Sequence, residues 1–106
     1  EVNRLEINIG GRKIGDGHPV FIIAELSANH GHKFENAVET IKAAKKAGAD
    51  AIKLQTYTAD TITIDCRNEY FQIQKGTIWD GKTLYDLYKE AYTPWEWQPE
   101  LFFVAF

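Results

Sequence analysis

The feature that most constrains the fold is a helical pattern enclosed by two apolar strand patterns within about 35 residues. Residues 20–24 form an unbroken apolar run, which is typical of strands covered on both faces of a parallel sheet. Residues 34–46 repeat apolar side chains at helical spacing, and Gly48 supplies a stop signal. Residues 51–55 read as the next strand. This order predicts an α/β fold with a parallel strand pair and a right-handed crossover.

A β-hairpin is expected ahead of this unit. Residues 5–9 alternate between apolar and polar side chains, and Gly10-Gly11 separates them from a second short run at 12–14. A Gly-Gly pair between two strand patterns favours a tight turn. Residues 25–32 are expected to form a loop.

The region after residue 55 is expected to be mostly loop as far as Gly81, with a short extended piece at 61–64. Capping boxes at 83–86 and 93–96 then predict two helix starts. Since proline does not fit deep inside a helix, Pro99 predicts a short turn and a restart near Gln98. The side chains expected to face the core are Trp97, Leu101 and Val104.

Composition excludes several function classes. The net charge of −3 leaves no basic patch to neutralise a nucleic-acid backbone. A lone cysteine, Cys66, excludes an internal disulfide and suits a reducing cytoplasm. Because no histidine lies next to Cys66, the sequence does not favour this cysteine as a catalytic nucleophile. No apolar stretch approaches the roughly 20 residues that span a bilayer. Because the sequence has no methionine and ends at Phe106 within a helical pattern, we expect a piece of a longer protein.

The alternation of side chains along strands singles out an acid and an amine. If helices cover the face of Ile52 and Leu54, then Lys53 and Gln55 point to the opposite, interior face. The same parity sends Glu25 to that face, at the carboxyl end of the neighbouring strand. Such ends are where α/β folds place ligands. Two interpretations stay open, a Glu25–Lys53 ion pair and a site for an anionic ligand such as phosphate or carboxylate.

The loop after the first strand carries two histidines. His30 and His32 lack a third ligand nearby, so they favour a polar lining over a metal site. Asn29 and His30 are better candidates for substrate-loop or loop-shaping residues.

Hydroxyls and aromatic rings follow the second strand. The side chains of Tyr57, Thr58, Asp60 and Thr61 suit a sugar ligand or, alternatively, ordinary capping of the loop. The three tryptophans could stack on a sugar, although packing is the more common role for aromatic residues near helix starts; they are Trp79, Trp95 and Trp97.

Three stretches together resemble a known family. They are residues 21–30 (FIIAELSANH), residues 53–60 (KLQTYTAD), and residues 84–88 (LYDLY) with 93–97 (TPWEW). They resemble the N-terminal part of the sialic acid synthases, and the closest similarity is to the pseudaminic acid synthase branch, with the spore coat polysaccharide synthesis proteins also related. The resemblance covers almost the whole chain.

The resemblance implies a TIM (β/α)₈ barrel enzyme that condenses phosphoenolpyruvate with an N-acetylated amino sugar, giving a nonulosonic acid and phosphate. By this resemblance, Lys53 binds phosphoenolpyruvate, Gln55 contacts the sugar acceptor, and Glu25 is a catalytic carboxylate. Asn29 and Tyr57 are expected to bind substrate. A divalent metal, Mn²⁺ or Mg²⁺, is implied, with ligands outside this chain.

The same resemblance predicts that residues 1–106 are an incomplete part of the barrel, with a hairpin at 1–15 and the first two βα units at 20–106. We expect this piece to be inactive alone, and the full-length enzyme to be a cytoplasmic homodimer. Rival predictions are an N-acetylneuraminate or legionaminic acid synthase, a spore coat polysaccharide synthesis protein, or, from another class, a non-catalytic binding domain that folds as a monomer.

Overall fold

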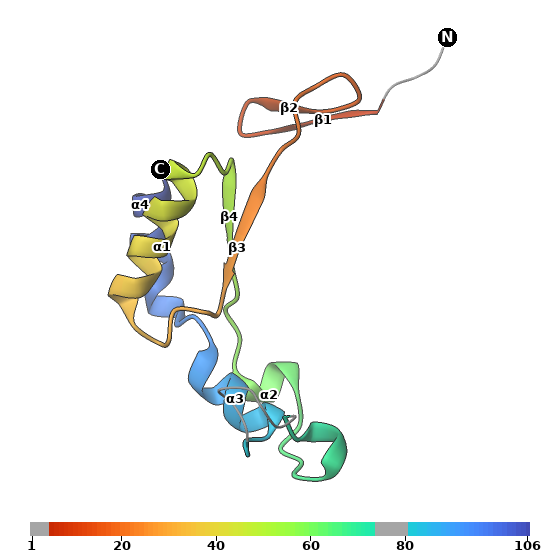
Figure 1. Cartoon of the computed structure of the whole chain (residues 1–106), viewed down its shortest axis with the longest axis vertical. Coiled ribbons are helices and arrows are strands. Elements are labelled where there is room, and N and C mark those ends of the chain that lie inside the picture. The colour runs from red at the N-terminus through yellow and green to blue at the C-terminus, as the bar shows by residue number, and fades with distance from the viewer. Residues whose placement is uncertain (1–4, 74–80) are drawn as a thin grey trace.

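The structure is a computed structural model that describes residues 5–73 and 81–106, so the prediction for Trp79 lies outside the described residues. The chain begins with three strands and continues mainly in helices and short 3₁₀ turns (Figure 1). In chain order the elements are β1 (Glu6–Ile9), β2 (Arg12–Gly15), β3 (Ile23–Ser27), α1 (Phe34–Lys46), β4 (Ala51–Leu54), α2 (Ala59–Ile62), η1 (Glu69–Phe71), α3 (Leu84–Ala91), η2 (Trp95–Trp97) and α4 (Gln98–Ala105). No helix in the described ranges has the length and apolar character needed to cross a membrane.

The hairpin prediction is confirmed. β1 and β2 pair antiparallel, with Ile9 opposite Arg12. The two turn residues, Gly10 and Gly11, have φ values of 57° and 84°, which side chains other than glycine rarely adopt. The hairpin is tied to the start of β4 by an ion pair between Arg12 and Asp50.

β3 and β4 form the predicted parallel pair, but the first strand lies further along the chain than residues 20–24. The ladder starts at Ile23 opposite Ala51, and it continues through Glu25 to Ser27. The start of β3 is set by its partner strand. The carboxylate of Asp50, just before β4, accepts a hydrogen bond from the backbone N–H of Ile22 at 2.8 Å, and the ladder begins after this contact. The prediction of a loop from residue 25 is therefore wrong for 25–27.

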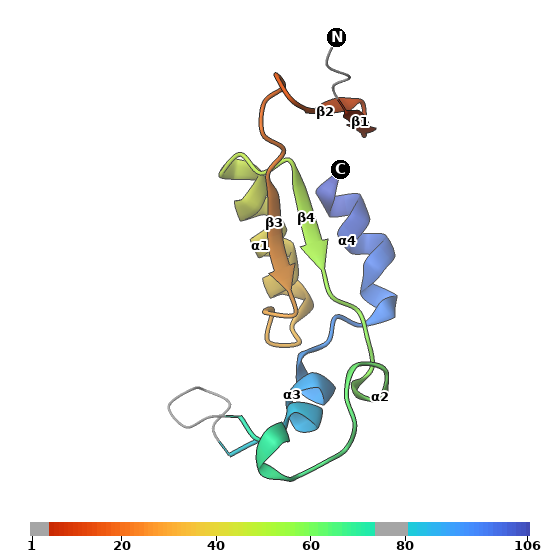
Figure 2. The ribbon, with the colours of Figure 1, turned by 90° about the vertical axis from the view of Figure 1, so that its right-hand side faces the viewer.

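The core lies on one face of this strand pair. α1 packs across that face, and α4 lies against α1 on the same side of the strands, as Figures 1 and 2 show. α1 occupies the predicted range, and its apolar stripe packs against α4. The fully buried members of the core are Leu26, Ala37, Ile41 and Leu101, and Trp97, Val104, Ile52 and Leu54 pack against them.

The expected loop at 56–81 contains regular structure within its described part. Residues 59–62 form a helical turn, α2, where an extended piece at 61–64 was expected. The reason is local, since Thr58 caps the turn and Thr61 closes a capping box with it. The short 3₁₀ turn η1 follows, and the side chain of Asn68 caps it.

The C-terminal helices start as the sequence predicts, with one exception. Thr83 caps α3 by accepting a hydrogen bond from the Asp86 amide at 3.2 Å. α4 begins at Gln98 after a 3₁₀ turn, so the restart before Pro99 is confirmed. The second capping box is wrong: no side chain caps η2, and the hydroxyl of Thr93 is engaged elsewhere.

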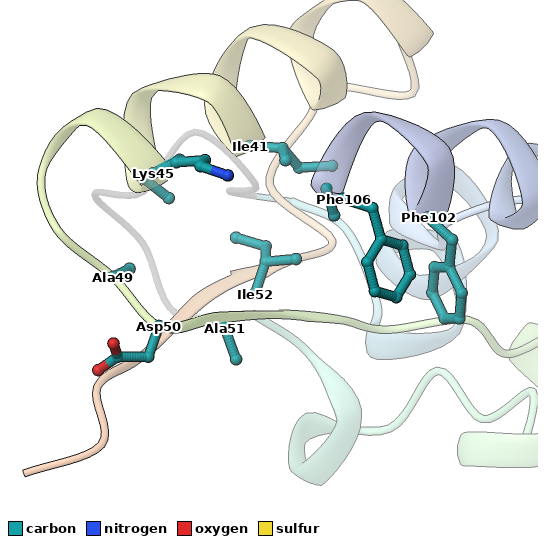
Figure 3. A pocket seen from close by; sticks show the side chains of 10 residues that line it. Ile41, Lys45, Ala49, Asp50, Ala51, Ile52, Phe102 and Phe106 are labelled. Atoms are coloured by element: carbon teal, nitrogen blue, oxygen red, sulfur yellow. The ribbon is translucent and has the colours of Figure 1, made fainter. Parts of the chain in front are cut away.

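Apolar surface remains uncovered at the far end of α4. The exposed fractions of Phe103 and Phe106 are 82% and 99%. A cavity of about 320 Å³ opens between α1, α4 and the start of β4, and Figure 3 shows Phe102 and Phe106 on one side of it and Ile52 at its floor.

Candidate functional site

Glu25 and Lys53 meet on the face of the strand pair that the helices do not cover. The two residues are direct partners in the parallel ladder. The Lys53 Nζ atom donates a hydrogen bond to Glu25 Oε1 at 3.2 Å, and each side chain is 57% exposed. The alternation argument therefore holds, because Leu26 and Leu54 on the other face pack into the core.

The ion pair itself adds little to folding stability. Exposed pairs of this kind contribute about 0–1 kcal/mol, since water screens the attraction and two long side chains lose freedom. An ammonium carries three N–H donors. Among the described residues, Glu25 is the partner of Nζ that the structure records, so the arrangement also accommodates an anion beside the pair.

The carboxyl end of β3 is irregular. The ladder is bulged between Glu25 and Ser27, and Ser27 has a φ of 58°, in the left-handed region. For a residue with a side chain this conformation costs roughly 1–2 kcal/mol. Such strain persists only where neighbouring contacts hold it in place.

A buried chain of hydrogen bonds supplies those contacts. His30 Nδ1 accepts from the His32 amide at 3.0 Å, which leaves the proton of the neutral ring on Nε2. Nε2 then donates to Thr93 Oγ1 at 2.8 Å, and Thr93 Oγ1 donates to the carbonyl of Ser27 at 3.2 Å. His30 and Thr93 are 1% and 0% exposed.

The environment keeps His30 neutral. Burial disfavours the imidazolium and lowers the pKa of His30 below its ordinary value, and the nearby His32 lowers this pKa further. The ring of Trp97 packs edge-on against His30, at 5.0 Å between centroids. Of the two roles open for His30, loop shaping fits this geometry.

Gln55 and Asn29 lie at the ends of the two strands. Gln55 follows β4 and its side chain is exposed, while its backbone N–H donates a hydrogen bond to the carbonyl of Ser27 at 2.9 Å. Asn29 is exposed in the loop after β3, and its backbone N–H donates a hydrogen bond to the carbonyl of Leu26 at 3.0 Å. Asn29 also lines a hollow of about 720 Å³ between this loop and α3.

Tyr57 lies in an aromatic cluster against α3. Its ring meets Tyr88 edge-on at 5.4 Å and Tyr92 at 6.4 Å. Burial raises the pKa of Tyr57, and the nearby Tyr88 adds to the effect.

The other polar side chains after β4 serve the loop itself. Thr58 and Thr61 form the cap of α2, and Asp60 accepts a hydrogen bond from Tyr85 at 3.1 Å. These contacts match the capping interpretation of the polar residues.

The described residues do not assemble a metal centre. No group of three or more His, Cys, Asp or Glu side chains lies together in the described ranges. Both ring nitrogens of His30 are occupied, as described above, so the pair of loop histidines is not arranged as a ligand set.

Sequence reasoning missed Thr93 as a site-supporting residue. Its pattern with Pro94 and Glu96 indicates a helix cap, and its true partners lie 63 and 66 residues away. No local pattern in the sequence signals these partners.

Comparisons with known proteins agree on one family. The model of the NeuB family matches residues 40–105. The chain is 58% identical to the pseudaminic acid synthase of Campylobacter jejuni over 86 residues, which is 81% of this chain and 25% of that protein. It is 49% identical to the pseudaminic acid synthase of Helicobacter pylori over 82% of this chain and 25% of that protein. The chain thus spans about a quarter of these relatives' length.

Solved structures give the same result. A sialic acid synthetase from Leptospira borgpetersenii, in complex with citrate, superposes with a TM-score of 0.74 at 30% identity. The match covers 96% of this chain and 30% of that one. The spore coat polysaccharide biosynthesis protein SpsE from Bacillus subtilis superposes with a TM-score of 0.63 at 32% identity, over 94% and 24% of the two chains.

Proposed function

The chain belongs to the NeuB family, and from that premise we propose that it is the N-terminal part of a pseudaminic acid synthase. The identity of 58% to the Campylobacter jejuni enzyme, over 81% of the chain, is the observation that carries this proposal. Identity to a legionaminic acid synthase of Legionella pneumophila is lower, at 39% over 71% of the chain.

The proposed reaction joins phosphoenolpyruvate to an N-acetylated amino sugar. The enol carbon of phosphoenolpyruvate attacks the open-chain aldehyde of the sugar and forms the new carbon–carbon bond. Water adds at the carbon that bears the phosphate, and inorganic phosphate leaves. The proposed scaffold is a (β/α)₈ barrel, in which β3 and β4 are the first two barrel strands and their carboxyl ends line the active site.

Lys53 is the proposed anchor for phosphoenolpyruvate. An ammonium at the end of a parallel strand attracts a phosphate or carboxylate, and charge-assisted hydrogen bonds of this kind are strong. The contact to Glu25 at 3.2 Å supports this role, because the carboxylate holds the flexible lysine side chain over the open face before the donor arrives.

The other proposed site residues lie on the same open face of the strand pair and in the two loops beside it. Glu25 is the proposed catalytic carboxylate near the reacting centre. Gln55, which offers both a donor and an acceptor, is proposed to contact the sugar. Asn29 and Tyr57 are proposed substrate-binding residues. For Tyr57 the aromatic cluster against α3 limits the contact to its exposed edge.

The metal implied by the family resemblance does not fit the described residues alone, since they hold no group of three ligating side chains. We propose that Mn²⁺ or Mg²⁺ takes its ligands from outside this chain. A cytoplasmic location and a homodimer stay predictions, which fractionation and analytical ultracentrifugation of the full-length protein test.

The test is phosphate release by the longest reading frame that contains this chain. Phosphoenolpyruvate is offered with each candidate N-acetylated amino sugar in turn, with Mn²⁺ or Mg²⁺ present. We expect release with the pseudaminic acid precursor sugar. Release with N-acetylmannosamine alone would overturn the pseudaminic assignment and favour an N-acetylneuraminate synthase, and release with none would overturn the synthase proposal.

A further inference from the structure

We propose that Thr93 and His30 are positioning residues that clamp the carboxyl ends of β3 and β4 together and thereby set where Glu25, Lys53 and Gln55 stand relative to one another. The effect on catalysis rests on the proposed synthase function, whereas the clamp itself does not.

Thr93 bonds to both strand ends at once. Its hydroxyl donates to the carbonyl of Ser27, at the end of β3, at 3.2 Å. Its backbone amide donates to the carbonyl of Gln55, just past β4, at 2.9 Å. A single buried residue from the segment between α3 and η2 therefore bridges the two strands.

The carbonyl of Ser27 is the shared point of the clamp. It accepts one hydrogen bond from the Gln55 amide at 2.9 Å and a second from Thr93 Oγ1. A carbonyl oxygen has two lone pairs, so both are used. These two bonds hold the bulged, left-handed backbone of Ser27, which lies two residues after Glu25.

His30 fixes the direction of the Thr93 hydroxyl. Because Nε2 donates to Oγ1, the hydroxyl must turn its own hydrogen toward Ser27. His30 is in turn held by the amide of His32 and by the ring of Trp97. The loop after β3 is thus bonded back to the strand that it leaves.

The first experiment breaks the clamp, and its main variant, Thr93→Val, keeps the side-chain size almost unchanged. Thr93→Val removes the hydroxyl, Thr93→Ser retains it, and His30→Leu removes the donor from the other side. Thr40→Val is the matched control, since the Thr40 hydroxyl also donates to a backbone carbonyl, that of Asn36 at 2.7 Å, on the exposed side of α1. The variants are made in the full-length protein.

Hydrogen exchange of the Gln55 backbone N–H reports on the clamp without any assumption about function. We expect exchange to accelerate by about tenfold in Thr93→Val and His30→Leu. It should stay near wild type in Thr93→Ser and Thr40→Val. Unchanged exchange in both clamp-breaking variants would overturn the clamp, and two independent variants guard against one that fails to fold.

Phosphate-release kinetics report on positioning. Because misplacement by about 1 Å can cost a hundredfold in rate, we expect kcat to fall by about 100-fold in Thr93→Val and to recover in Thr93→Ser. A loss of melting temperature with unchanged kcat would show that Thr93 is merely structural. If the wild type releases no phosphate with any sugar, the proposed function fails, and the amide exchange still decides the clamp.

Discussion

Lys53 and Glu25 carry their charges in the open, where solvent screens the attraction between them. Their backbones are nevertheless held opposite each other, because the two residues are ladder partners on adjacent strands. The same pair is thus of little use for stability and well placed for binding an anion. Its contributions to folding stability and to anion binding can be separated by measuring both on one substitution.

Lys53→Ala should raise the KM for phosphoenolpyruvate by about 30- to 900-fold in the full-length enzyme, the equivalent of about 2–4 kcal/mol of lost charge-assisted bonding. The free energy of unfolding should change by no more than about 1 kcal/mol. Lys13→Ala is the matched control, since Lys13 pairs with Glu6 at 3.7 Å in the hairpin. Steady-state kinetics and chemical denaturation give the two numbers, and an unchanged KM would refute the role of Lys53.

His30 should titrate below the ordinary histidine range, because burial lowers its pKa. Above about pH 6.5 both folded and unfolded forms are neutral, so the stability that neutral His30 supports is fully present. As the pH falls, the unfolded chain takes up the proton first, and this stability is lost as the pH passes through the lowered pKa of the folded state.

The measurement is a titration of ¹⁵N-labelled histidine by NMR, together with melting curves from pH 7.5 to pH 5. Wild-type protein should lose more stability on acidification than His30→Gln does. A His30 resonance that titrates above pH 6.5 would contradict the expectation.

At this scale the sequence predicts side-chain direction better than it predicts partners. The alternation that places Lys53 beside Glu25 needs only the strand pattern, which is local. Thr93 bonds to residues 63 and 66 positions away, and no local pattern carries that information. The local pattern therefore predicts a helix cap at Thr93, the nearest local use of a threonine.

Among the elements, α4 divides its apolar residues between the core and the surface. Leu101 is fully buried against Ala37 and Ile41, whereas Phe103 is 82% exposed. Two residues of similar hydrophobicity on one helix therefore differ in how much apolar area they remove from water.

Leu101→Ala should lower the free energy of unfolding by about 2–5 kcal/mol, because it leaves a cavity between α1 and α4. Phe103→Ala should lower the free energy of unfolding far less if the full-length protein leaves the Phe103 side of α4 exposed. Urea denaturation of both variants makes the comparison. Equal losses would mean that Phe103 is covered by another part of the protein.

Elements with strong periodicity were predictable, and those made by tertiary contacts were not. α1 was expected at 34–46 and lies there, since its stripe spans more than three turns. The start of β3 depends on where Asp50 binds the Ile22 amide, which no local pattern shows. α2 is a single turn, too short to show a helical period.

As a whole, the molecule is more extended than a compact domain of its size. The Cα radius of gyration is 17.8 Å, whereas about 13 Å is typical of 106 residues. The accessible surface is 8164 Å², against about 6,000 Å² for a compact protein of this mass. Much of the excess is apolar, at the hairpin, on β3 and along α4.

The chain of residues 1–106, produced alone, should therefore associate and should release no phosphate from phosphoenolpyruvate with any sugar. Exposed apolar area on this scale drives association in water. Sedimentation velocity over a range of concentrations should show species larger than the 12.1 kDa monomer. A monomer that melts cooperatively would instead favour the rival prediction of a self-contained binding domain.

The parallel ladder between β3 and β4 has one further consequence. The ladder, together with the clamp at Gln55 and Thr93, holds Glu25 opposite Lys53, so the spacing of the two residues does not depend on the length of the segment from α2 to α3. Insertions there leave the charges in register while reshaping whatever surrounds them. If Lys53 anchors phosphoenolpyruvate as proposed, changes in that segment would alter the surroundings of the sugar without moving the anchor.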